Sequence, residues 1–483
     1  MYLGVDLGTS GLRVLLADDR GKALGSASAD FTVENPRQGW SEQQPSAWIE
    51  GLRVALSKLK QSHGGELAKV RAIGLSGQMH GAVVLDAKDA PLRPCILWND
   101  TRSAKEAAHF DALPGVRELS GNIAFPGFTA PKLIWMAKHE PELFSQVAKV
   151  MLPKDYLRLY LTGEHATEMS DAAGTSWCDV SGREWSDTLL SAGGMRTQQM
   201  PRLLEGTASS GTLRPAICRE FGLPSTAIVV GGAADNAAAA CGSGCVEEGQ
   251  AFVSLGTSGV ILVARESCEP APDTAVHTFC HAVPERWYQM GVILAATDAL
   301  NWLARLVGET PAALAGRLPD LPKAPSAIQF LPYLSGERTP HNDADIRASF
   351  VGLDIAHDRD DLVAAVMQGV GFALRDSLEA LRGTGAKIDQ LLAVGGGTQS
   401  SYWLHTLAAI LQTPLLRPAE GELGAALGAV RLAMVGDGHS LSEAMAQPDV
   451  AQTVQPQANL SDAYEASYAQ YRALYPNIKA ALS

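Results

Sequence analysis

Two aspartates occupy positions where a carboxylate could take part in chemistry. Asp235 lies between an apolar run that ends in two glycines and an alanine-rich segment, so we expect it where a buried strand meets a helix. A carboxylate there could accept the proton of a substrate hydroxyl while the hydroxyl oxygen attacks a phosphoryl group. Asp6 directly precedes a glycine-bounded turn, where its carboxylate could hold Mg²⁺ directly or through water. Each also has a structural alternative, because Asp caps helices and turns.

A second chemical feature is a five-residue segment that occurs twice. Leu-Gly-Thr-Ser-Gly stands at residues 7–11 and again at 255–259, about half of the 483-residue chain apart. Apolar runs flank both copies, which predicts strand, tight turn and strand. The glycines allow N–H groups to point outward and the hydroxyls add donors, which suits a phosphate. The alternative is two unrelated hairpin turns, but the repetition favours two similar domains that face one ligand.

Met79 and His80 end a further apolar run, and polar side chains lie beside them and after another run, at Gln78, Asn99, Asp100 and Arg102. Open α/β sheets bind ligands at the carboxyl ends of their strands. These side chains could therefore hold a polyhydroxylated, uncharged molecule through several hydrogen bonds. The alternative for His80 is an ordinary, partly buried histidine with a satisfied ring.

Neither of two familiar nucleotide motifs is present, since the sequence contains no P-loop and no Gly-x-Gly-x-x-Gly after an expected strand. Residues 395–397 are three consecutive glycines between an apolar run and an expected helix. Their bare backbone would let the base and ribose of a nucleotide approach closely. A tight strand-to-helix turn without a ligand is the alternative.

The elements that must position these residues alternate between strands and helices, which is typical of the α/β class. We expect a β-meander over 1–35, strands at 70–75, 82–85, 227–230 and 391–394, and helices over 48–59, 362–381 and 425–435. The polar stretches 153–156 and 170–175 are expected to be loops, and 447–459 a connector. A tyrosine stripe near the end of the chain is expected to pack in the core, through Tyr464, Tyr468, Tyr471 and Tyr475.

The composition, with 46% apolar and 19% charged residues, is that of a globular protein with a large core. A net charge of −13 argues against nucleic acid or an anionic membrane as a partner. The chain shows no basic leader and no run of 18 apolar residues. Seven cysteines without a Cys-x-x-Cys motif fit a reducing compartment, so we expect a cytoplasmic protein in which Cys241 and Cys245 pack in the interior.

Several of these segments resemble the FGGY carbohydrate kinases, and they occur in the order of that family between residue 2 and about residue 435. The segments that carry the resemblance are 4–11, 129–135, 231–236, 255–259 and 336–341. One departure is the pair Ala233-Ala234 before Asp235, where further glycine is frequent in such kinases.

The resemblance implies two ribonuclease-H-like (actin-like) α/β domains around a central cleft, a sugar-binding domain over 1–246 and a nucleotide-binding domain over 247–483 that includes the C-terminal helix. It makes Asp235 the general base and Asp6 the Mg²⁺-linked carboxylate. It places Met79, His80, Asp235 and Asn236 at the sugar. It places Thr9, Ser10, Arg13, Gly256 and Thr257 at the phosphates, and Gly396 and Gly397 at the adenosine.

The activity that the resemblance implies is phosphorylation of a sugar by ATP with Mg²⁺, and the sugar we expect is D-xylulose, attacked through its 5-hydroxyl. Ribulose, gluconate, fuculose and glycerol remain alternatives because the sugar end is where related kinases diverge. An actin- or Hsp70-like nucleotide switch and a sugar sensor without catalysis are alternatives from other classes. By analogy with relatives, a homodimer is expected.

Overall fold

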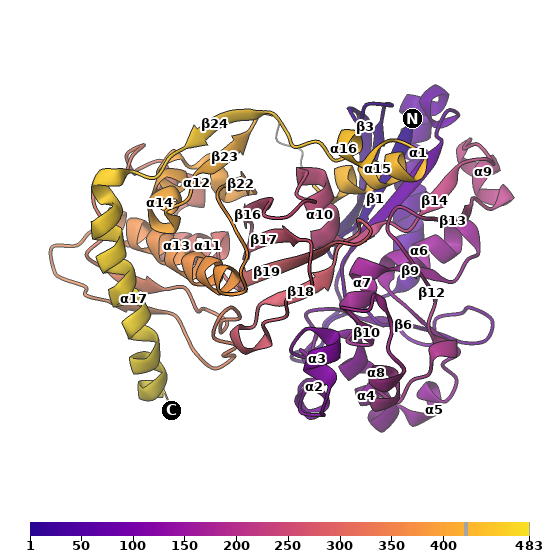
Figure 1. Ribbon diagram of the computed structural model, residues 1–483, viewed down its shortest axis with the longest axis horizontal. Coiled ribbons are helices and arrows are strands. Elements are labelled where there is room, and N and C mark those ends of the chain that lie inside the picture. Colours follow the sequence, from indigo (N-terminus) through magenta and orange to yellow (C-terminus); the bar gives the residue numbers. More distant parts are fainter. Residues whose placement is uncertain (420–423, 483) are drawn as a thin grey trace.

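The chain forms two seven-stranded mixed sheets with helices on their faces, as seen in a computed structural model that describes residues 1–419 and 424–482 (Figure 1). In the first sheet the order is β13-β14-β5-β1-β2-β3, with β15 also paired to β5. Its strands are β1 (Tyr2–Leu7), β2 (Gly11–Ala17), β3 (Ala23–Asp30), β5 (Ala72–Gly77), β13 (Ser209–Thr212), β14 (Ile228–Val230) and β15 (Ala233–Ala234). The meander expected at the start of the chain is confirmed.

The second sheet repeats the plan of the first. Its order is β18-β19-β17-β16-β22-β23-β24. In each sheet the repeated Leu-Gly-Thr-Ser-Gly segment joins two antiparallel strands, β1 to β2 in the first sheet and β16 to β17 in the second. Strand β1 also lies parallel to β5, and strand β16 lies parallel to β22. The strands are β16 (Ala251–Leu255), β17 (Gly259–Arg265), β18 (His277–Cys280), β19 (Trp287–Ile293), β22 (Leu391–Val394), β23 (Leu415–Pro418) and β24 (Val450–Val454). The two-domain α/β fold is therefore confirmed.

One helix from late in the chain packs on the first sheet. Helix α15 (Ala425–Gly436), drawn in orange-yellow among the indigo strands, lies directly on β1 and β5 and beside α10 (Asp235–Ser243) (Figure 1). Small residues allow this approach, since a Cβ on Gly74 would stand 1.9 Å from the Ala429 carbonyl oxygen. Because the chain returns to the first sheet after residue 424, a division of the chain at 246 stays a proposal.

Long amphipathic helices cover the other faces. Helix α1 (Pro45–Leu67) buries the stripe that begins with Trp48 and Leu52 against the first sheet, and α13 (Arg359–Gly383) crosses the second. Helix α17 (Ser461–Leu482), at the left edge of Figure 1, buries the expected tyrosine stripe, in which Tyr464, Tyr468 and Tyr471 are at most 5% exposed. The second sheet is completed by α11 (Thr297–Val307), α12 (Pro311–Ala315) and α14 (Ser401–Leu411).

The remaining elements form a smaller layer beside the first sheet and short outer turns. The helices are α2 (Ala104–Asp111), α3 (Val116–Ser120), α4 (Thr129–His139), α5 (Pro141–Phe144), α6 (Pro153–Thr162), α7 (Met169–Ala173), α8 (Asp187–Ala192), α9 (Pro215–Phe221) and α16 (Leu441–Ala444). The paired strands are β4 (Glu42–Gln43) with β7 (Cys95–Ile96), β6 (Val83–Leu85) with β8 (Lys149–Met151), β9 (Ala166–Glu168) with β12 (Arg202–Leu204), β10 (Cys178–Asp179) with β11 (Glu184–Trp185), and β20 (Gln329–Leu331) with β21 (Ser349–Val351). Among the described residues, no helix combines the length and apolar character that crossing a bilayer requires.

Three expectations were wrong. The stretches 153–156 and 170–175 are not loops, because they contain the first turn of α6 and most of α7. Pro153 begins α6, where its fixed φ suits a first turn, and Lys154, Asp155 and Asp171 are wholly buried rather than solvated. The expected connector at 447–459 contains β24, an edge strand whose mostly exposed residues give no alternating pattern.

Candidate functional site

The first sheet brings several of the predicted residues to one edge. Strand register aligns Leu7 with Gly77 and Gly77 with Ala234 across three parallel strands. The residues that follow these positions, including Asp235, therefore emerge together at the carboxyl ends of the strands, where α/β sheets bind ligands. Asp6 lies one residue back from this edge, paired in register with Arg13 on β2.

Asp235 begins helix α10, and within residues 1–419 and 424–482 its Oδ1 accepts hydrogen bonds while its Oδ2 accepts none. Its Oδ1 accepts hydrogen bonds from the backbone N–H of Asn236 at 2.7 Å and from the Asn236 side-chain amide at 3.0 Å. Burial, reinforced by the negative charge of Asp6, raises the pKa of Asp235 to about 7. The carboxylate is therefore a stronger base than an ordinary aspartate, and its orientation is fixed by Asn236.

Asp6 has the chemistry of a Mg²⁺ ligand that shares the ion with phosphate oxygens and water. Burial raises the pKa of Asp6, and the positive charge of Arg13 opposes that shift. A divalent cation beside this partly buried carboxylate would favour its ionised form and offset the repulsion from Asp235. Within residues 1–419 and 424–482, no cluster of three or more His, Cys, Asp or Glu forms a cage for a metal ion. The residues fit an ion carried in with phosphates.

In the first repeated loop, Thr9 is tied to residues from three other segments. Its hydroxyl donates to Gln78 Oε1 at 3.1 Å and accepts from Trp98 Nε1 at 2.9 Å, and its carbonyl accepts from Gln43 Nε2 at 2.7 Å. Ser10, next along the loop, is exposed. The loop is thus fixed at Thr9 while the hydroxyl of Ser10 faces solvent.

In the second loop, the backbone anchors the start of α11. The Gly256 carbonyl accepts from Thr297 N at 2.9 Å, and the Thr257 carbonyl accepts from Ala296 N at 2.8 Å. The Thr257 side chain is exposed. Both copies therefore present a hydroxyl-bearing turn at the end of a strand, as the repetition predicted.

A cavity of about 910 Å³ lies between the two sheets and contains predicted residues from both. Arg13 and Asn236 line it from the first domain, and Gly396 lines it from the second. Arg417 at the end of β23 also lines it, and sequence reasoning missed this cation. Two arginines, a side-chain amide and a glycine backbone from four segments thus line one cleft, which suits a polyphosphate.

A neighbouring cavity of about 600 Å³ is more apolar and shares Gly396 with the first. Gly397, Leu300 and Tyr402 are among its lining residues. The glycine turn is required by backbone geometry, because Gly395 has a φ of 93° and a Cβ there would stand 2.7 Å from the Leu255 carbonyl oxygen. A flat base could lie in this slot with its phosphates in the adjoining cleft.

Shortly after the carboxyl end of β5, His80 is held in a strained backbone conformation. Its φ is 69°, and its carbonyl accepts from Lys132 Nζ at 2.8 Å and from Thr129 Oγ1 at 3.1 Å. Burial lowers the pKa of Lys132 to about 7. The sequence analysis used the segment 129–135 only for its resemblance to a family, and it did not predict the contact between Lys132 and His80. The two donors hold the backbone at this left-handed residue.

The His80 ring has a defined tautomer. Nδ1 lies 2.7 Å from the Gly174 carbonyl oxygen, so Nδ1 carries the proton and Nε2 is left as an acceptor. Burial lowers the pKa of His80 to about 3, so the ring is neutral. It stacks on Phe128 at 4.2 Å between centroids, and Met79 lies beside it against Gly174. The pair presents an acceptor and an apolar surface, which suits a hydroxylated chain.

Residues of the second domain lie close to His80, whose ring centroid is 6.4 Å from that of Phe279. The Arg338 guanidinium lies 4.6 Å over the ring of Phe125 and 3.5 Å from His277 Nε2. Burial lowers the pKa of Arg338, and its charge also contributes to the lowered pKa of His80. Arg338 and His277 were missed by sequence reasoning, which treated 336–341 only as part of the resemblance.

The comparison with known proteins decides the family. The family model for the N-terminal domain of the FGGY carbohydrate kinases matches residues 1–242, and the one for the C-terminal domain matches residues 251–436. This chain belongs to the FGGY family of carbohydrate kinases. It is 44% identical to the xylulose kinase of Escherichia coli over 483 residues, which cover 99% of each chain.

Solved structures agree with this FGGY kinase along its whole length. A xyloylose kinase from Brucella ovis is 52% identical with a TM-score of 0.98, and each chain is covered to 99%. A gluconate kinase from Lactobacillus acidophilus is 25% identical with a TM-score of 0.91, covering 99% of this chain and 98% of its own. The same fold thus occurs in relatives that are named as kinases of different sugars.

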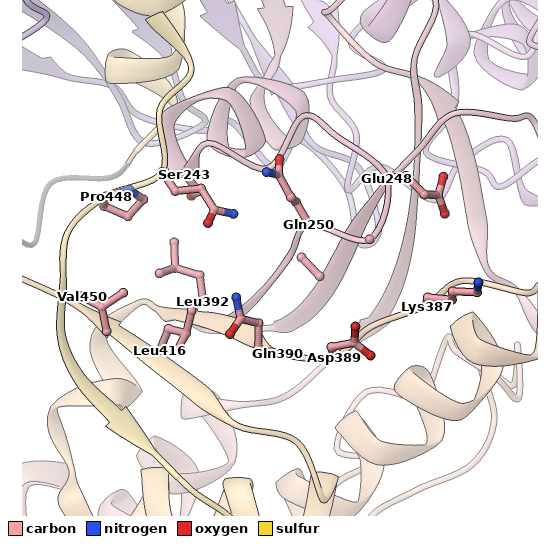
Figure 2. Close-up of a pocket in the computed structure, with 13 residues that line it drawn as sticks. Ser243, Glu248, Gln250, Lys387, Asp389, Gln390, Leu392, Leu416, Pro448 and Val450 are labelled. Carbon is pink, nitrogen blue, oxygen red and sulfur yellow. The ribbon is translucent and has the colours of Figure 1, made fainter. Parts of the chain in front are cut away.

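A third cavity of this FGGY kinase, about 420 Å³, lies at the opposite ends of β16 and β22 (Figure 2). Figure 2 shows Glu248, Lys387 and Asp389 along one side and Pro448 and Val450 on the other. None of the predicted site residues lines it. The cleft cavity and the apolar slot beside it thus hold the predicted nucleotide residues Arg13, Gly396 and Gly397, whereas Asp6, Met79, His80 and Asp235 line neither of them.

Proposed function

We propose that this carbohydrate kinase transfers the γ-phosphoryl group of ATP to the 5-hydroxyl of D-xylulose. The observation that carries the reaction is Asp235, a carboxyl with a pKa of about 7 that is oriented by Asn236, a residue that lines the cleft cavity. The sugar is supported by the full-length likeness to the Escherichia coli xylulose kinase.

In the proposed reaction, the sugar lies between Asp235 and the acceptor Nε2 of His80, with Asn236 and Met79 beside it. The 5-hydroxyl oxygen attacks the γ-phosphorus, the bond to the β-phosphate oxygen breaks, and the hydroxyl proton passes to Asp235. Because the proton leaves late in such a loose transition state, placement of the carboxylate matters more than its basicity.

ATP would lie across the two adjoining cavities. The adenosine would border Gly396 and Gly397 in the apolar slot, and the phosphates would meet Arg13 and the hydroxyl-bearing turns at Thr9, Ser10, Gly256 and Thr257. Mg²⁺ bound through Asp6 would supply charge neutralisation at the phosphates. Arg417, which also faces the cleft, adds a cation on the nucleotide side.

A second candidate substrate is an acidic sugar such as gluconate. Arg338 favours it, because this buried cation lies near His80 and forms no ion pair within 4.0 Å among the described residues. The 25% identical gluconate kinase has the same fold. A carboxylate on the sugar could pair with Arg338.

The test is ADP release from Mg·ATP with D-xylulose, D-ribulose, L-ribulose, L-fuculose, gluconate and glycerol, each compared with no sugar. We expect kcat/KM for D-xylulose to exceed that for each other sugar by at least about tenfold, the discrimination that one or two hydroxyl contacts provide. A preference for gluconate would move the assignment to the acidic sugar. Equal, slow release with every sugar and with none would favour a nucleotide switch.

We also propose a cytoplasmic location, which the seven free thiols support. A homodimer is proposed by analogy, and it would appear as twice the 51.0 kDa chain mass in light scattering.

A further inference from the structure

A cluster of five ionisable side chains is completely buried behind the turn that leads to Asp235. Its members, each with 0% exposed side chain, are Lys154, Asp155, Arg158, Glu168 and Asp171. Lys154 Nζ lies 3.0 Å from Asp155, 3.2 Å from Glu168 and 2.8 Å from Asp171. Burial raises the pKa of Asp171 well above its ordinary value, and the positive charge of Lys154 opposes that shift.

A gain in stability does not explain why these five charged side chains are buried. Removing charges from water costs several kcal/mol per ion, and buried ion pairs are often no more stabilising than apolar residues of the same shape. None of these five residues lines the cleft cavity or the apolar slot. The contacts of the cluster with the backbone show what it holds.

One contact runs from Glu168 to the residue before the base. Ser170 Oγ donates to Glu168 Oε2 at 2.8 Å and accepts from the backbone N–H of Ala234 at 3.0 Å. Glu168 is itself fixed, because it also accepts from Ser170 N at 2.7 Å and is paired with Lys154. The Ser170 hydroxyl thus has one orientation, with its proton toward Glu168 and its lone pair toward Ala234.

A second contact holds the other end of the same turn. The Arg158 guanidinium donates to the carbonyl oxygens of Val230 and Gly231. Residues 231–234 are two glycines and two alanines, so no side chain of the turn can hydrogen-bond to fix it. Gly232 has a φ of 76°, and a Cβ there would stand 2.0 Å from the Leu75 carbonyl oxygen. The turn therefore depends on neighbouring groups for its position.

We propose that Ser170, oriented by Glu168 and Lys154, is a positioning residue that holds the Ala234 backbone and so places the Asp235 carboxylate for proton transfer. The inference rests on the proposed function, because it takes Asp235 as the general base. Ser170 acts through the backbone and has no role in binding sugar or nucleotide.

The test is steady-state kinetics of Ser170→Ala, with Ser170→Thr as the variant that restores a hydroxyl. We expect S170A to lower kcat by about 10- to 100-fold, the cost of misplacing a reacting group by up to ~1 Å, while both KM values stay within about twofold. S170T should recover most of the lost kcat. The matched control is Ser377→Ala, which removes another buried hydroxyl, one without a hydrogen-bond partner among the described residues, and should leave kcat unchanged.

Thermal unfolding of each variant separates positioning from loss of structure. A folded S170A enzyme with wild-type kcat would overturn the proposal, and so would a loss of kcat that S170T does not recover. If S170A does not fold, Ser170→Cys, whose thiol is a weak donor and acceptor, is measured with the same expectation. Asp235→Asn distinguishes the two claims: full activity in D235N would refute the proposed base, whereas an inactive D235N beside a fully active S170A would refute only the role of Ser170.

Discussion

At the scale of single residues, the site depends on groups whose protonation state is set by burial. The neutral His80 ring accepts through Nε2, and the Asp235 carboxyl has a pKa of about 7. Burial is the main cause in both cases, joined by the negative charge of Asp6 for Asp235, and the Gly174 carbonyl fixes which ring nitrogen of His80 carries the proton. The protonation states of His80 and Asp235 therefore depend on the surrounding residues as much as on the two side chains themselves.

The pKa of Asp235 predicts the pH dependence of the reaction. The carboxyl must be ionised to accept a proton, and its raised pKa means that it becomes protonated as the pH falls through about 7. We expect kcat/KM to fall by about tenfold per pH unit below that point, measured by ADP release between pH 5 and 9. A profile that stays flat down to about pH 5 would contradict a base with a raised pKa.

Sequence reasoning identified the residues at strand ends but not their partners. Asp6, His80 and Asp235 could be predicted because each directly follows or ends an apolar run. Lys132, Arg338 and Arg417 could not, since the contacts of Lys132 with His80, of Arg338 with Phe125 and of Arg417 with the cleft cavity leave no sign in the local sequence. The contact of Lys132 with the His80 carbonyl spans 52 residues and depends on the fold.

At the scale of elements, the packing of α15 joins the late part of the chain to the catalytic edge. Helix α15 lies on β1 and β5, which lead to Asp6 and to the loop before His80, and on α10, which begins at Asp235. The contact is close because glycines face it, and a Cβ on Gly428 would stand 1.8 Å from the Ala238 carbonyl oxygen.

Gly428→Ala is therefore expected to separate α15 from α10. Overpacking of this kind lowers the free energy of unfolding by about 1–3 kcal/mol. We expect a loss of about 3 kcal/mol, because the Cβ would meet the backbone of Ala238, which cannot move aside as a side chain can. Urea denaturation measures the loss. Gly424→Ala is the control at the start of the same helix, because a Cβ there meets nothing within 4 Å. Equal stability of the two variants would show that α15 does not pack as described.

Most elements could be predicted from their periodicity, and the exceptions have a common physical cause. The strand at 391–394 and the helix from 425 agree with expectation because their apolar faces are buried. The stretches 153–156 and 170–175 were predicted to be loops because their charges were taken as solvated, whereas those charges neutralise one another inside the protein. Pairing between segments cannot be read from either segment alone.

At the scale of the whole molecule, the two domains divide the work. In the proposed mechanism, the first would supply the base and the sugar contacts at Asp235 and His80, while the residues that line the apolar slot come from the second. The repeated loop places one hydroxyl-bearing turn on each side of the cleft. We therefore propose that the phosphoryl group passes from a nucleotide held mainly by the second domain to a sugar held by the first. Nucleotide binding and proton acceptance would then depend on different residues.

The most direct measurement of this claim is turnover of D-xylulose by Asp235→Asn beside titration of the variant with ATP. The amide keeps the shape of the side chain but cannot accept the hydroxyl proton, so we expect kcat to fall by about 10²- to 10⁴-fold. The dissociation constant for ATP should stay within about twofold, because the slot lies in the other domain. Turnover within about tenfold of the wild-type rate would contradict Asp235 as the base, and with it the mechanism proposed for this kinase.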